Sequence, residues 1–173
     1  MPASATRRVP VYVNVYDMIP SSAITTLGYY MGVGVFHSGV EILEKEFNFG
    51  GHEYNFTGVF CVEPRVGPPG VIYKETILVG FTTKSDIEIN QVIQQLSKEF
   101  TGDSYTLLTR NCNHFSSEMA FRLTGSRPPA WINRAAKLGT MFPCVVPQGW
   151  VEPPTAEEED AVRDRESLLH GGQ

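Results

Sequence analysis

Cys112 occupies the position in this chain best suited to chemistry. It lies within residues 109–115 (TRNCNHF), where a polar loop meets a predicted helix. Free backbone N–H groups and the positive end of a helix macrodipole stabilise a thiolate at such a position and lower the cysteine pKa. The same N–H groups can bind the oxyanion formed when a carbonyl is attacked. The pattern indicates a nucleophile; the alternative is a small apolar residue that fills space at a helix start.

A cysteine nucleophile requires a base, and the chain offers four histidines. His114 is close in sequence, but side chains two residues apart on a helix point about 200° away from each other. His170 belongs to the acidic C-terminal segment, and His52 lies in a glycine-flanked loop that favours a surface or turn-stabilising role. His37 remains.

Strand alternation directs His37 to the same side as two valines of its strand, so we expect its imidazole to be partly buried. Its small neighbours Gly34, Ser38 and Gly39 would let a helix end approach the strand closely. Taken alone, His37 would be interpreted as a core histidine bonded to backbone. An inward strand histidine together with Cys112 at a helix start instead predicts a thiol–imidazole dyad.

The sequence does not assign a third, orienting group. Asn14, Glu41 and Asn113 can each hydrogen-bond an imidazole, and each also suits a structural or solvated role. Asn111 and Asn113 flank the nucleophile and are the candidates for oxyanion-binding or orienting residues.

The other two cysteines, Cys61 and Cys144, lie in apolar surroundings that favour buried, inert thiols. No CxxC spacing is present, so we expect neither a metal site nor a disulfide scaffold.

Strand patterns dominate the N-terminal half. Val9–Tyr16 alternates with period two, and further strands are expected at 33–42, 44–49, 58–63 and 71–81. Helices follow. A capping-box pattern at Ser85 and Glu88 opens the first, a second spans 111–124, and a short third begins after Pro128-Pro129 and ends at Gly139. The fold class is therefore α+β, an antiparallel sheet or barrel packed against C-terminal helices.

Charge divides the chain into a body and a tail. The net charge is −5, but residues 153–173 hold six acidic and two basic residues, so residues 1–152 carry only −1. We expect a flexible N-terminus (1–8), one folded domain (9–152) and an acidic disordered tail (153–173). A near-neutral body without a basic stripe argues against nucleic acid as a partner. No signal peptide or membrane-spanning run is apparent, which leaves the cytoplasm as the default compartment and the nucleus open.

Several blocks together carry a resemblance to a known family: VYD (15–17), GVFHSGVE (34–41), FGG (49–51), Tyr105 with NCNHF (111–115), and WINR (131–134). The chain resembles the PPPDE family, permuted papain-fold peptidases that include the desumoylating isopeptidases. Within that family it is most similar to the branch of the second desumoylating isopeptidase. The resemblance covers about residues 9–150.

The resemblance implies a cysteine isopeptidase, either deubiquitinating or desumoylating, that works without a cofactor. It would cleave the bond between the C-terminal glycine of SUMO or ubiquitin and a substrate lysine. The matching positions are Cys112 as nucleophile and His37 as general base and acid. Its partners would be ubiquitin- or SUMO-conjugated proteins.

The sequence leaves alternatives open. The preferred modifier is undecided, and the same dyad could open an S-acyl thioester. A non-catalytic module that binds ubiquitin-like modifiers is a third reading. A homodimer is compatible with the sequence, which does not fix the oligomeric state.

Overall fold

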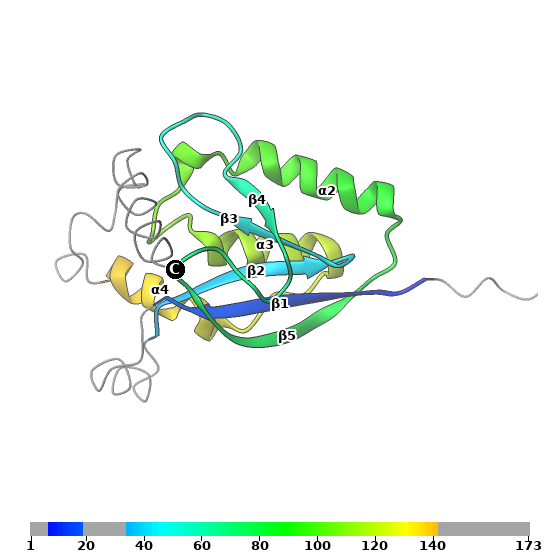
Figure 1. Ribbon diagram of the computed structural model, residues 1–173, viewed down its shortest axis with the longest axis horizontal. Coiled ribbons are helices and arrows are strands. Elements are labelled where there is room, and N and C mark those ends of the chain that lie inside the picture. Colours follow the sequence, from blue (N-terminus) through cyan, green and yellow to red (C-terminus); the bar gives the residue numbers. More distant parts are fainter. Residues whose placement is uncertain (1–6, 19–33, 142–173) are drawn as a thin grey trace, which may run out of the picture.

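The computed structural model describes residues 7–18 and 34–141, which form an antiparallel five-stranded sheet with helices against it (Figure 1). The strands are β1 (Val9–Asp17), β2 (Phe36–Ile42), β3 (Lys45–Phe49), β4 (Val59–Val62) and β5 (Ile72–Thr82). Their order is β4-β3-β2-β1-β5, so the chain meanders from β1 to β4 and then returns β5 to the far side of β1. The strands predicted from period-two patterning are confirmed within these residues.

Within the described residues, three α-helices and two 3₁₀ turns follow the sheet: α2 (Asp86–Glu99), η1 (Gly102–Ser104), α3 (Cys112–Thr124), η2 (Ala130–Asn133) and α4 (Arg134–Met141). The predicted capping box at the start of α2 is formed, with Ser85 and Glu88 each bonding the other's backbone. The predicted end of the third helix is wrong, because Gly139 lies inside α4.

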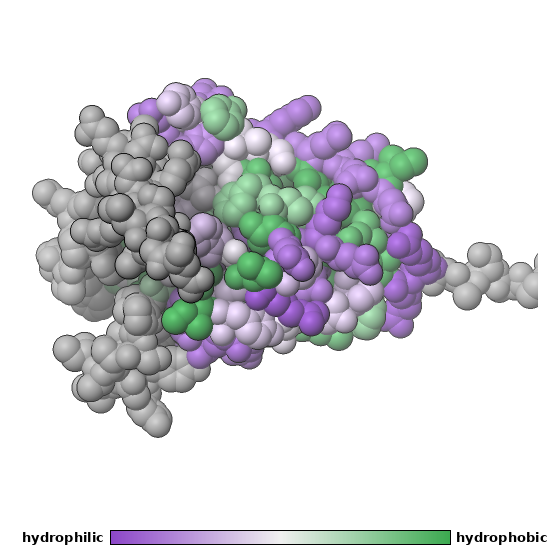
Figure 2. Space-filling model, in the orientation of Figure 1, coloured by the Kyte–Doolittle hydropathy of each residue, from purple (hydrophilic) through white to green (hydrophobic). Residues whose placement is uncertain are grey.

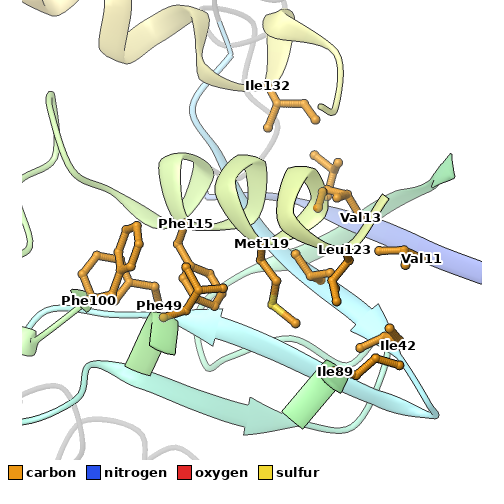
Figure 3. Close-up of a cluster of buried hydrophobic side chains, with 14 of the residues drawn as sticks. Val11, Val13, Ile42, Phe49, Ile89, Phe100, Phe115, Met119, Leu123 and Ile132 are labelled. Carbon is orange, nitrogen blue, oxygen red and sulfur yellow. The ribbon is translucent and has the colours of Figure 1, made fainter. Parts of the chain in front are cut away.

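The apolar core lies between one face of the sheet and α3, which also contacts α2. Alternation along β1 sends its valines to this face: Val9, Val11, Val13 and Val15. Figure 3 shows Phe115, Met119 and Leu123 directed from α3 toward the strands. Because these positions recur every three or four residues, one stripe of α3 is buried and the helix is fixed against the sheet.

Part of the opposite face of these strands is polar and also buried. Asn14 and Tyr16 alternate with the β1 valines, and both are fully buried. The connection between β4 and β5 covers them: the backbone N–H of Arg65 donates to Glu46 of β3, and Gly67, at φ 73°, packs on the Tyr16 ring. Burial of polar groups requires that they bond one another, and this requirement shapes the surroundings of His37.

One predicted burial is wrong. Cys61 is exposed, because β4 is an edge strand on which Phe60 and Cys61 both face solvent. Phe60, Val66 and Ile72 are among the exposed apolar side chains. Figure 2 shows hydrophobic surface next to hydrophilic surface on one face of the molecule. Cys144, His170 and the predicted acidic tail lie outside the described residues.

Two further properties concern binding and membranes. In residues 7–18 and 34–141, no cluster of three or more His, Cys, Asp or Glu residues is arranged to hold a metal ion. No helix of this part of the chain has the length and apolar character needed to cross a membrane.

Two isoleucines of α2 test the core. Ile89 is fully buried, whereas Ile87, two residues away, is 72% exposed. We expect Ile89→Ala to lower the free energy of unfolding by about 2–5 kcal/mol, because it leaves a cavity. Ile87→Ala should change it by less than about 0.5 kcal/mol. Urea denaturation of both variants checks this, and equal losses would contradict the orientation of α2.

Candidate active site

Cys112 is the first residue of α3, and its side chain is buried. Asn111 is the N-cap of α3, with its Oδ1 accepting from the backbone N–H groups of Asn113 (3.0 Å) and His114 (3.1 Å). This cap fixes where the helix begins. The thiol therefore lies at the positive end of the helix, as expected from the sequence.

The start of α3 docks onto β2 at Ser38, the residue after His37. The Ser38 backbone N–H donates to the Cys112 thiol, and its carbonyl accepts from the Ser116 hydroxyl at 2.8 Å. Both groups are free because the pairing of β2 with β3 runs only from Val40 to Ile42. The start of β2, which is paired with β1 but not with β3, thus gives the helix end a place to bond.

His37 reaches the same thiol from the polar face of the sheet. Its ring is buried, it hydrogen-bonds Cys112, and its Nε2 lies 2.7 Å from Oδ1 of Asn48 on β3. An amide oxygen only accepts, so Nε2 carries the hydrogen. Nδ1 is then the ring nitrogen left for the thiol. The predicted cysteine and histidine are brought together, and Asn48 orients the imidazole.

The two side chains shift each other's pKa. Burial alone raises the pKa of Cys112, but the positive His37 imidazolium, together with donation from Ser38 and Tyr105, holds it below its usual value. Burial, the largest single effect, lowers the pKa of His37, but the Cys112 thiolate, the hydrogen bonds to Cys112 and Asn48 and the charge of Glu46 together raise it above its usual value. Opposite shifts of this kind favour a thiolate–imidazolium ion pair.

Tyr105 is a third residue at the thiol. Burial, followed by the nearby Cys112 thiolate, raises the pKa of Tyr105, so its hydroxyl stays protonated and donates to the sulfur. Its ring packs on Phe49, and Gly51 leaves room for it, since a Cβ there would lie 2.9 Å from the Tyr105 Cβ. From the sequence alone, Tyr105 is identified only as part of the blocks that carry the family resemblance.

The asparagines predicted beside the nucleophile hold the scaffold together. Asn111 Nδ2 donates to Leu107 O at 2.7 Å, in addition to its capping bonds. Asn113 donates to Phe36 O at 2.9 Å and accepts from Ser38 Oγ at 2.7 Å. Both amides tie the helix start to its neighbours, and the side-chain amide that bonds His37 belongs to Asn48.

The remaining candidates for an orienting group or a base bond elsewhere. Asn14 donates to Glu41 at 3.0 Å and to Glu46 at 2.6 Å. His114 bonds Asn111 and Asn133 rather than the thiol, and burial followed by the charges of nearby cations lowers its pKa. His52 lies in a loop, and its Nε2 is 3.1 Å from the backbone oxygen of Thr57.

A cavity of about 140 Å³ opens beside Cys112. Most of its wall is apolar and comes from the start of β2, the loop before α3, η2 and α4. The apolar lining residues are Met18, Val35, Phe36, Leu107, Leu108, Ile132, Ala135, Ala136 and Gly139. A reacting group that approaches Cys112 along this cavity would leave bulk water.

Comparisons with known proteins identify the family of the chain. The PPPDE putative peptidase domain matches residues 9–150. The chain is 42% identical over 139 residues to a DeSI-like protein of Arabidopsis thaliana, which is 80% of this chain and 60% of that protein. It is 41% identical over 156 residues to Desumoylating isopeptidase 1 homolog of Caenorhabditis elegans (87% and 46%). It is 40% identical over 136 residues to a DeSI-like protein of Schizosaccharomyces pombe (78% and 68%). The aligned part of this chain thus spans about half to two thirds of these relatives.

The ion pair predicts how Cys112 reacts with a small alkylating agent. A thiolate exists above the cysteine pKa, and because that pKa is lowered, Cys112 should react at pH 6, where a free cysteine with pKa about 8.5 is almost entirely thiol. His37→Ala removes the imidazolium and should slow alkylation at pH 6 by about tenfold or more.

Peptide-resolved mass spectrometry of iodoacetamide labelling across pH measures this rate, with exposed Cys61 as the reference within the same chain. Identical pH profiles for Cys112 in the wild type and in His37→Ala would show that the two side chains do not form an ion pair.

Proposed function

Because the chain belongs to the PPPDE putative peptidase family, we propose that it is a cysteine isopeptidase that releases a ubiquitin-like modifier from a lysine of a conjugated protein. The observation that carries the proposal is the buried Cys112–His37 pair at the start of α3, with Asn48 orienting the imidazole. SUMO is the first modifier to test, because relatives bear the name desumoylating isopeptidase. Ubiquitin is the alternative.

In the proposed reaction, the Cys112 thiolate attacks the carbonyl carbon of the modifier's C-terminal glycine. The backbone N–H of Cys112, at the positive end of α3, donates to the oxyanion that forms. The His37 imidazolium gives its Nδ1 proton to the departing lysine amine, and a thioester remains on Cys112.

Hydrolysis completes the cycle. Neutral His37 takes a proton from water, and the hydroxide formed attacks the thioester carbonyl. The C–S bond breaks, the modifier leaves with a free carboxylate, and the thiolate–imidazolium pair is restored. Asn48 keeps Nδ1 aimed at the sulfur throughout, since Nε2–H remains bonded to its amide oxygen.

A second candidate function is hydrolysis of protein S-acyl thioesters by the same dyad. The apolar cavity beside Cys112 favours it, because a fatty acyl chain would be bound there away from water. The chemistry is shared, since both reactions pass through a thioester on Cys112. The groups that leave, a lysine amine or a protein thiol, distinguish them.

Single substitutions test the dyad. Cys112→Ser and His37→Ala should each lower turnover of SUMO or ubiquitin conjugates by about 10³-fold or more, since each removes a group that bonds to or exchanges protons with the substrate. Cys61→Ser, on the exposed edge strand, is the control and should keep full turnover. Circular dichroism should show all three folded. Undiminished turnover in both dyad variants would refute the proposal.

Modifiers that carry a C-terminal electrophile separate the candidate functions. We expect SUMO or ubiquitin of this kind to form a covalent adduct at Cys112, detected as a mass increase and mapped by peptide sequencing. If neither modifier forms an adduct while a palmitoyl thioester is hydrolysed, the thioesterase replaces the isopeptidase. Binding of a modifier without adduct or turnover would mean that the domain is a non-catalytic binding module.

A further inference from the structure

We propose that Glu46 is a positioning residue of this site: its buried carboxylate fixes the orientation of the Asn48 amide and, through it, the imidazole of His37. The proposal rests on the proposed function, in which His37 exchanges protons with the substrate. Glu46 itself does not touch Cys112 or the reacting bond. It would act through Asn48 and through its charge.

The surroundings of Glu46 indicate a charged carboxylate. It is fully buried on β3, and its oxygens accept from the Tyr16 hydroxyl (2.8 and 2.9 Å), the Asn14 amide (2.6 Å), the Asn48 amide (3.3 Å) and the Arg65 backbone N–H (3.0 Å). These donors are neutral groups, converging on one acceptor. A buried carboxylate requires partners that replace the lost water, and this set of donors stabilises its negative charge without an ion-pair partner.

The carboxylate of Glu46 fixes the donor and acceptor roles along the chain of hydrogen bonds from Glu46 through Asn48 to His37. An ionised carboxylate only accepts, so Asn48 must turn its NH₂ toward Glu46 and its oxygen toward His37. The oxygen in turn requires hydrogen on Nε2, which leaves Nδ1 for Cys112. A flipped amide would set its oxygen against the carboxylate and its NH₂ against Nε2–H. Glu46 therefore selects both the amide orientation and the tautomer of His37.

Gly39 keeps the space for this pair. It lies two residues after His37 on the same strand, and side chains so spaced share one face. A Cβ at Gly39 would overlap the Glu46 carboxylate and lie 2.5 Å from Asn48 Oδ1. The space left by the missing side chain of Gly39 is therefore filled by Glu46 and Asn48, which lie beside the His37 imidazole.

The charge of Glu46 also acts on His37 directly. Burial and Cys112 have the largest effects on the His37 pKa, and the Glu46 charge adds to the rise. Of the other charges, Glu41 is paired with the Arg65 guanidinium at 3.1 Å, which offsets it. In the part of the chain that the structure describes, the titratable groups around His37 and its network are Cys112, Tyr105, Tyr16, Tyr73, Glu41, Glu46 and Arg65.

Tyr16 and Tyr105 stay neutral donors. Burial and then the hydrogen bond to Glu46 raise the pKa of Tyr16 far above its ordinary value, and Tyr73 packs edge-on against the Tyr16 ring. On the side of the His37 ring away from Cys112, the negative charge is thus that of Glu46. It stabilises the imidazolium, and the imidazolium stabilises the thiolate.

The experiment compares Cys112 alkylation across pH in the full chain for the wild type, Glu46→Gln and Glu44→Gln. Glu46→Gln keeps the shape and removes the charge, and we expect alkylation at pH 6 to slow by about tenfold, with a matching loss in kcat/KM for modifier release. Glu44→Gln removes an exposed charge from the preceding turn and is the matched control. Its profile should match the wild type.

A double-variant cycle separates positioning from a structural role. If Glu46 acts through Asn48 as well as through its charge, Glu46→Gln should slow alkylation less in an Asn48→Ala background than in the wild type, whereas equal slowing in both backgrounds would show that Glu46 does not act through Asn48. If Glu46→Gln does not fold, as judged by circular dichroism, Glu46→Asp keeps the charge, and its alkylation profile should lie near the wild type. A Glu46→Asp profile displaced as far as that of Asn48→Ala would overturn the proposal.

The outcomes distinguish this inference from the proposed function. A wild-type Cys112 that reacts at low pH, with a Glu46→Gln profile equal to that of Glu44→Gln, would overturn the role of Glu46 and leave the isopeptidase intact. Wild-type protein that shows the ion pair but releases no modifier would refute the isopeptidase and leave the role of Glu46 in place.

Discussion

The hydrogen bond between the buried side chains of Cys112 and His37 is the interaction on which the surrounding structure depends. Both groups are buried, and a buried charge is costly unless partners replace the water it has lost. The Cys112 sulfur accepts hydrogen bonds from Ser38 and Tyr105 and lies at the positive end of the α3 dipole. The His37 imidazole bonds the amide oxygen of Asn48. Much of the local backbone geometry serves to bring these donors and acceptors within reach.

The two members of the pair come from opposite faces of one sheet. The apolar face fixes α3, and therefore the position of Cys112, through the packing of its buried stripe. The polar face carries His37, since its neighbour across the β1–β2 pairing is Tyr16. The faces meet where β2 is not paired with β3, so that the helix end bonds to Ser38. If β2 were paired with β3 along its whole length, the backbone N–H and C=O of Ser38 would bond β3 and would not be available to α3.

Several parts of this site followed from local patterns. A polar loop before an apolar stripe predicted a helix starting near Cys112, and strand alternation predicted a buried His37. The α+β fold class and the family are confirmed. Asn48 was missed because its position depends on the β2–β3 turn. That turn has two residues, Leu43 (φ 51°) and Glu44 (φ 60°), and lacks the Asn-Gly or Asp-Gly signature of its kind.

The sequence by itself determined which residues could form a thiolate, a base and a helix terminus, because helix dipoles, caps and side-chain alternation are properties of a few neighbouring residues. Only the tertiary structure decided that β5 returns beside β1, that the pairing of β2 with β3 stops at Val40 and leaves Ser38 to the helix, and that Glu46 and Asn48 fill the space over Gly39. These features depend on strand register and packing between residues far apart in the chain. Such contacts are fixed when whole faces are buried together, which no short window of sequence encodes.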